Sequence, residues 1–121
     1  MRLLLIDDDE HLHGYLKAVF SAVRCIKKVH CVSTPEQFAK ALITKPDLFI
    51  VDVDLKADIN GLELVQKHKD EIGKKPVIIM SAMDDIHLAV TKLQGQGFNC
   101  VTAFQKPINI KEIGVFFGDD E

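Results

Sequence analysis

Runs of consecutive apolar residues recur along the chain, and each is followed by a stretch in which apolar residues have helical spacing. The runs at 3–6, 48–51 and 77–80 are unbroken, which is typical of strands covered on both faces of a parallel sheet. Weaker patterns predict a second strand at 29–32 and a fifth at 100–104. The pattern therefore predicts five strands that alternate with helices.

Helix signals lie between these strands. An apolar stripe at spacings of three and four covers 12–23, as on an amphipathic helix. Residues 34–37 read Thr-Pro-Glu-Gln, a capping box with proline at the first helical position. Gly61 opens a third helix, and Asp84 or Asp85 can cap a fourth.

Five βα units imply one three-layer α/β domain, which we expect to span 1–118. An acidic tail would follow at 119–121, leaving no room in this sequence for an output module. Right-handed crossovers would cover both faces of the sheet, and a last helix at 110–117 is expected to turn residues 115–117 toward the core. In such sheets the functional crevice lies beyond the carboxyl ends of the strands.

Composition excludes several classes of protein. With 15 Lys and Arg against 18 Asp and Glu, the net charge is −3, so no basic field invites nucleic acid or an anionic membrane. No apolar run approaches a membrane span, and the N-terminal run is too short for a secretory signal. Cys25, Cys31 and Cys100 are odd in number without metal-binding spacing. We therefore expect a reduced, cytoplasmic protein in which the cysteines are small buried hydrophobic residues.

Polar residues end four of the predicted strands: Asp7 and Asp8 follow the first, Asp52 the third, Ser81 the fourth and Lys106 the fifth. Because neighbouring parallel strands lie about 4.8 Å apart, these residues can converge in one pocket. Gathered carboxylates repel one another unless a cation intervenes, and Mg²⁺ fits because it needs few protein carboxylates. Such a site can accept a phosphoryl group: a carboxylate attacks phosphorus, while an ammonium and a hydroxyl bind the phosphoryl oxygens.

Five motifs, in order along the chain, carry a family resemblance. They are Ile-Asp-Asp-Asp-Glu at 6–10, Pro-Asp-Leu-Phe-Ile-Val-Asp at 46–52, Asn-Gly-Leu-Glu-Leu at 60–64, Val-Ile-Ile-Met-Ser-Ala at 77–82 and Lys-Pro at 106–107. Over the whole chain they resemble the receiver domain of bacterial response regulators. The resemblance implies a (βα)5 flavodoxin-like, doubly wound parallel sheet with strand order 2-1-3-4-5. It also implies a signalling switch, not an enzyme, that takes a phosphoryl group from phosphohistidine and hydrolyses it slowly.

The same resemblance assigns roles to the acidic residues. Asp52 looks like the phosphoacceptor, and Asp7 and Asp8 look like the acidic pair that supports Mg²⁺. Asp8 would bind the ion directly, together with Asp52 and the backbone carbonyl of Asp54, with Asp7 behind them. The acidic side chain of Asp54, beside the pocket, is expected to tune hydrolysis.

The resemblance also assigns roles to the residues expected to bind the phosphoryl group. Ser81 resembles the switch hydroxyl, with Ala82 next to it as a phosphate-binding position. Lys106 resembles the phosphate-pairing lysine, and Pro107 would follow a cis peptide bond, which costs far less before proline than elsewhere.

Among the departures from the family pattern, two bear on the loop beside the site and on the signalling readout. Gly61 lies nine positions after Asp52, one more than the commonest spacing. Ala103 stands where receivers usually carry an aromatic residue that moves with the switch hydroxyl. Strand alternation should turn the neighbouring Phe104 to the opposite face, so the usual signalling readout is in question.

The implied partners are a sensor histidine kinase or histidine phosphotransfer protein as donor, and a downstream protein on the last helix–strand–helix face. No nucleic acid or membrane contact is expected, and a homodimer is left open. Two alternatives remain: a receiver-like module that docks without phosphorylation, and, less favoured, a haloacid-dehalogenase-type phosphatase with Asp52 as nucleophile and Asp54 as general acid. The phosphatase family places its Asp-x-Asp strand first and its acidic pair last, the reverse of this chain.

Overall fold

The computed structural model describes residues 1–118, which form one five-stranded sheet and the helices around it. The strands are β1 (Arg2–Ile6), β2 (Lys28–Val32), β3 (Leu48–Asp52), β4 (Val77–Ser81) and β5 (Cys100–Gln105). The helices are η1 (Glu10–Leu12), α1 (His13–Ser21), α2 (Pro35–Ala41), η2 (Leu42–Thr44), α3 (Gly61–Lys67), α4 (Lys69–Ile72), α5 (Ile86–Gly95) and α6 (Ile110–Phe117). All strands pair in parallel, in the order β2-β1-β3-β4-β5. The predicted sheet is confirmed, and the acidic tail expected at 119–121 lies outside the described residues.

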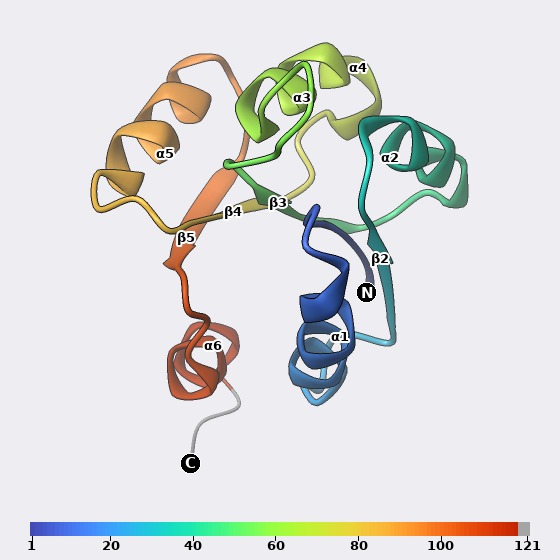
Figure 1. Cartoon of the computed structure of the whole chain (residues 1–121), viewed down its shortest axis with the longest axis vertical. Helices are drawn as coiled ribbons and strands as arrows, with labels where there is room; N and C mark the ends of the chain where they lie inside the picture. Colours follow the sequence, from blue (N-terminus) through green and yellow to red (C-terminus); the bar gives the residue numbers. More distant parts are fainter. Residues whose placement is uncertain (119–121) are drawn as a thin grey trace.

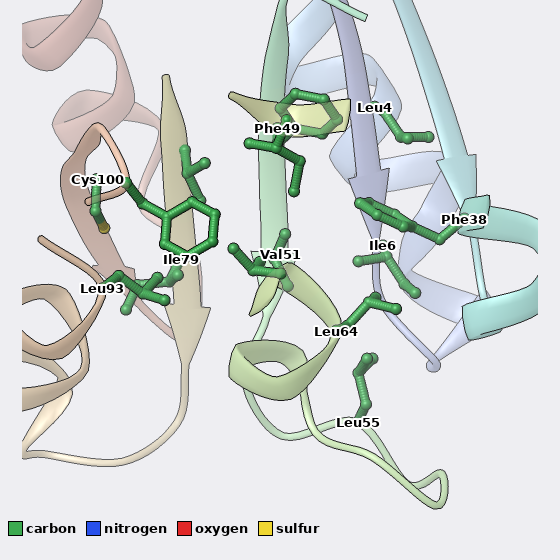
Figure 2. Close-up of a cluster of buried hydrophobic side chains, with 14 of the residues drawn as sticks. Leu4, Ile6, Phe38, Phe49, Val51, Leu55, Leu64, Ile79, Leu93 and Cys100 are labelled. Atoms are coloured by element: carbon green, nitrogen blue, oxygen red, sulfur yellow. The ribbon is translucent and has the colours of Figure 1, made fainter. Parts of the chain in front are cut away.

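Helices cover both faces of the sheet, as Figure 1 shows: α1 and α6 lie on one face, and α2 to α5 on the other. Along β1, Leu4 and Ile6 join the apolar cluster under α2 to α5, whereas Leu3 and Leu5 join the cluster under α1 and α6. Figure 2 shows the first cluster, with Phe38 of α2 packed over the sheet. Burial on both faces explains the unbroken apolar runs. No helix within residues 1–118 is long and apolar enough to cross a membrane.

Two predicted helix caps differ in detail from the structure. The Thr34 hydroxyl oxygen accepts a hydrogen bond from the Gln37 backbone at 3.1 Å, as expected of an N-cap. The Gln37 side chain, however, accepts from the backbone of Ser33 at 2.8 Å, so the reciprocal half of the capping box is shifted by one residue. Asp85 holds the N-cap position of α5, but its side chain makes no capping hydrogen bond.

The last helix has the predicted bounds but not the predicted burial. Ile113 is buried and Phe117 packs partly against the core, while Val115 is 63% exposed and Phe116 is 40% exposed. Ile113 and Phe117 are four residues apart and share one helix face. The expectation that residues 115–117 all face the core is therefore wrong for Val115, whereas the half-covered Phe116 ring packs edge-on against the buried Phe104 at a centroid distance of 5.8 Å.

The cysteines are also less buried than expected. Cys100 is buried, Cys31 is half-buried and Cys25 is exposed. Burial raises the pKa of the Cys100 thiol to about 11. The prediction of small buried hydrophobic residues holds for Cys100 and is wrong for Cys25, which lies in the turn between α1 and β2.

Ala103, which stands where the resembled family usually has an aromatic residue, lies in the edge strand β5. Ala103 is half-buried against the cluster under α2 to α5, and Phe104 is 2% exposed in the opposite cluster. The predicted alternation is confirmed, so Phe104 does not replace the missing aromatic residue.

Candidate functional site

Three carboxylates meet where β1 and β3 end side by side. Asp7 directly follows β1 and is fully buried, Asp52 is the last residue of β3 and is 1% exposed, and Asp8 is half-buried. One carboxylate oxygen from each of the three lies within 4.8 Å of the others. The structure thus brings together the acids that the strand ends predicted.

Lys106, which directly follows β5, reaches this group. Its Nζ atom lies 2.8 Å from Asp7 Oδ2 and 3.0 Å from Asp52 Oδ2. The Lys106 backbone nitrogen donates to the Ser81 carbonyl oxygen at 2.8 Å, which extends the pairing of β4 with β5 up to the lysine. The peptide bond between Lys106 and Pro107 is cis, the geometry that the resemblance implies.

Backbone amides hold the other carboxylate oxygens. The Asp9 nitrogen donates to Asp7 Oδ1 at 2.9 Å, and the Asp54 nitrogen donates to Asp52 Oδ1 at 2.9 Å. The Lys56 nitrogen donates to Asp8 Oδ2 at 2.8 Å. Each carboxylate is therefore oriented by a hydrogen bond from fixed backbone.

Burial and charge shift two of these groups. Burial raises the pKa of Asp52; hydrogen bonds from the Asp54 backbone and Lys106 offset part of the rise, and repulsion from Asp7 adds to it. For Lys106, burial lowers the pKa, but hydrogen bonds to Asp7 and Asp52 and the charges of these two residues outweigh it, so the pKa is raised. A charged lysine therefore lies between two buried carboxylates. Burial of Asp52 disfavours its ionised form.

The donor set suits a hard divalent cation. Against the carboxylates of Asp7, Asp8 and Asp52, Lys106 supplies one positive charge, so the pocket keeps an excess of negative charge. Mg²⁺ prefers oxygen ligands and is commonly bound through one or two carboxylates plus waters. The residues present therefore fit the ion.

Ser81, at the end of β4, contacts a different acid. It is 2% exposed, and its Oγ donates to Asp54 Oδ2 at 2.9 Å. The Ala82 backbone nitrogen donates to the same oxygen at 3.1 Å, and Ser81 Oγ accepts from the Met83 nitrogen at 3.0 Å. Sequence reasoning placed the Asp54 side chain beside the pocket but missed these partners. Asp54 lies in the turn that follows β3, so strand alternation does not fix where its side chain points and the sequence pattern carries no signal for these contacts.

Gly61 explains how the longer loop still packs against the site. Its nitrogen donates to the Val53 carbonyl oxygen at 3.2 Å, and a Cβ atom added at Gly61 would overlap the backbone carbonyl of Asp52. Asn60 and Glu63 close a capping box at this helix start. The start of α3 therefore lies directly against Asp52, and only a residue without Cβ fits there.

An open cleft of about 590 Å³ lies beside the acids. It is lined by the loops that follow β1, β2 and β3, including Asp8, Thr34, Leu55 and Lys56. Asp8 thus faces a space that a solute or a partner's side chain can enter, while Asp7 and Asp52 lie buried behind it.

Comparisons with known proteins agree with this architecture. The family model of the response regulator receiver domain matches residues 3–115. The regulatory protein AtoC of Escherichia coli (strain K12) is 22% identical over 115 residues, which cover 94% of this chain and 24% of AtoC. The chain thus spans about a quarter of that relative's length.

Solved structures show the same fold. A response regulator from Colwellia psychrerythraea is 25% identical with a TM-score of 0.80, and the match covers 97% of this chain and 93% of that chain. The N-terminal signal receiver domain of a two-component system response regulator from Bacteroides fragilis is 19% identical with a TM-score of 0.78, and the match covers 98% of this chain and 93% of that chain.

Proposed function

The chain belongs to the family of response regulator receiver domains, and on that premise we propose that it is a phosphoryl-controlled switch with Asp52 as the phosphoacceptor. The observation that carries this proposal is the Lys106 ammonium group, which lies between the buried carboxylates of Asp7 and Asp52. It holds the Asp52 carboxylate in place before the reaction. Afterwards it can pair with an oxygen of the new phosphoryl group.

The transfer step needs one nucleophile from this chain. A carboxylate oxygen of Asp52 attacks the phosphorus atom of a phosphohistidine, the P–N bond breaks, and the imidazole leaves with the electron pair of that bond. The switch is reset by slow hydrolysis, in which water attacks the phosphorus and the P–O bond to Asp52 breaks. Phosphate is released, the carboxylate is restored, and the proton of the water passes to phosphate or solvent.

Asp8, Asp52 and the backbone carbonyl of Asp54 would hold Mg²⁺, with Asp7 supporting them. When bound, the ion neutralises charge on the phosphoryl oxygens and aligns the donor. The chain's own part is to orient the ligands, through the Asp9 amide on Asp7 and the Asp54 amide on Asp52.

The donor would be a sensor histidine kinase or a histidine phosphotransfer protein. Of the three acids, Asp8 alone lines this open cleft, so the donor's phosphohistidine side chain would approach from the side of Asp8. A downstream partner would bind the face formed by α5, β5 and α6, where Leu88, Val101 and Phe116 expose apolar surface. Because Ala103 replaces the usual aromatic residue, we assign the transmission to Ser81 and the β4–α5 loop. Asp84 in that loop already accepts a hydrogen bond from Gln105 of β5 at 2.9 Å.

The proposal is tested by mixing the protein with Mg²⁺ and acetyl phosphate and measuring its intact mass. Wild type should gain the mass of one phosphoryl group, Asp52→Asn should gain none, and the exposed loop control Asp58→Asn should behave as wild type. Labelling that persists in Asp52→Asn would refute the assignment. If wild type gains no phosphoryl group and Asp52→Asn binds a partner unchanged, the chain is instead a module that docks without phosphorylation.

A further inference from the structure

The Asp54 carboxylate occupies two hydrogen-bond donors next to the phosphoacceptor. Its Oδ2 atom accepts from Ser81 Oγ at 2.9 Å and from the Ala82 backbone nitrogen at 3.1 Å. Ser81 Oγ also accepts from the Met83 nitrogen at 3.0 Å, which directs its single hydroxyl proton toward Asp54. All described buried side-chain nitrogen and oxygen atoms have a hydrogen-bond partner, so this small network is complete without a ligand.

These donors lie at the phosphoacceptor because of the strand pairing. Asp52 pairs with Met80 across β3 and β4, and the Val53 nitrogen donates to the Met80 carbonyl oxygen at 2.9 Å. Ser81 is therefore the next residue along β4 beside the end of β3. The Asp54 backbone nitrogen in turn donates to Asp52 Oδ1 at 2.9 Å, so one residue contacts both the acceptor carboxylate and the Ser81 hydroxyl.

Resting on the proposed function, we propose that the Asp54 side chain is an internal competitor of the phosphoryl group. In the unphosphorylated protein its carboxylate takes the Ser81 hydroxyl and the Ala82 amide, which are the donors proposed to bind the phosphoryl oxygens. Each of these donors has one proton to give, so a carboxylate and a phosphoryl oxygen cannot both receive it in full. A phosphoryl oxygen bound to the same donors would also be repelled by the charge of the Asp54 carboxylate. Phosphorylation of Asp52 therefore has to displace the Asp54 carboxylate before Ser81 can respond.

The competition gives the resting state a defined structure. Through Asp54, the loop after β3 is tied to the start of the β4–α5 loop at Ser81 and Ala82. Displacing the carboxylate releases this tie at the same moment as the phosphoryl group takes the freed donors. A side chain without charge at position 54 would leave the donors free and would favour the phosphoryl-bound state.

The test uses beryllofluoride with saturating Mg²⁺ as the phosphoryl analogue, with the Mg²⁺ affinity of each variant measured separately. Asp54→Ala should bind beryllofluoride roughly tenfold more tightly than wild type, about 1.4 kcal/mol, because no internal anion has to leave. The matched control Asp58→Ala removes an exposed aspartate from the same loop and should bind as wild type. In a Ser81→Ala background most of the gain from Asp54→Ala should vanish, since the contested hydroxyl is gone.

A measurement on the wild-type chain makes the test independent of how the variants fold. On binding beryllofluoride, the ¹³C resonance of the Asp54 carboxyl group should shift well beyond that of Asp58, because Asp54 loses two hydrogen bonds. An unshifted Asp54 carboxyl resonance, or an Asp54→Ala affinity equal to wild type, overturns the competition while leaving Asp52 as the acceptor. A wild-type chain that binds no beryllofluoride at saturating Mg²⁺ overturns the proposed function itself.

Discussion

Replacing Lys106 with methionine removes the ammonium group that lies 2.8 Å from Asp7 Oδ2 and 3.0 Å from Asp52 Oδ2. Methionine keeps most of the apolar length of the side chain, so the main change is the loss of charge. Removing one partner of a buried ion pair costs roughly 3–5 kcal/mol, because the remaining charge is left uncompensated. The Lys106 side chain is 19% exposed, so water can partly replace it. We therefore expect a loss of about 3 kcal/mol in the free energy of unfolding at neutral pH without Mg²⁺.

That loss should be measured by urea unfolding and by the thermal midpoint, which for a domain of this size falls by about 10 °C. Because saturating Mg²⁺ stabilises both proteins, it should narrow the difference only as far as the variant binds the ion more tightly, by about 1.4 kcal/mol for each tenfold ratio of the two Kd values. The variant should also bind Mg²⁺ more tightly than wild type, because the pocket has become more negative. Lys111→Met, at an exposed lysine of α6, serves as the control. Unchanged stability in Lys106→Met, or no greater gain from Mg²⁺ than in wild type, would refute the electrostatic reasoning.

Three further predictions follow from the packing and the pKa directions. Gly61→Ala forces a Cβ atom onto the Asp52 carbonyl, so it should lower the free energy of unfolding by about 1–3 kcal/mol and slow labelling by acetyl phosphate. A variant as stable and as reactive as wild type would contradict this contact. Iodoacetamide should label the exposed Cys25 first and Cys100 last, because the Cys100 thiol is buried with a pKa of about 11 and the thiolate is the reactive form; peptide mapping gives the order. Asp52→Asn should be more stable than wild type at neutral pH without Mg²⁺, because burial raises the pKa of Asp52 in the native state. The native state then binds more protons than the unfolded state, so wild-type stability falls as pH rises through the interval above 3.8. Urea unfolding across pH should show the difference shrinking toward acid, and a difference that grows there would reverse the sign.

The layered fold and the gathering of acids could be predicted from the sequence because both follow from topology. Asp7 and Asp52 each end an apolar run, and parallel strands place such ends at one edge of the sheet. The position of Lys106 at this edge could be predicted for the same reason, since it directly follows the fifth strand. The register of a buried strand is strongly specified, because a shift by one residue would move every side chain to the opposite face of the sheet. The residue at which each strand ends can therefore be predicted from the apolar run.

The contacts of Asp54 could not be predicted in the same way. They depend on the path of the loop between β3 and α3, where hydrogen bonds and side-chain rotamers compete and no periodic pattern applies. Gln37 shows the same limit, since its side chain binds the Ser33 amide one residue before the expected partner. The prediction is wrong for Val115 because α6 packs on the sheet through one face that contains Ile113, and apolar character alone does not say which face is covered.

The central claim is that Asp52 carries the phosphoryl group, and borohydride reduction tests it most directly. An aspartyl phosphate is reduced by borohydride to homoserine, whereas an unmodified carboxylate is not. After incubation with Mg²⁺ and acetyl phosphate, reduction and peptide mapping should find homoserine at position 52. Homoserine at position 7, 8 or 54 instead, or at no position while wild type remains folded, would contradict the account.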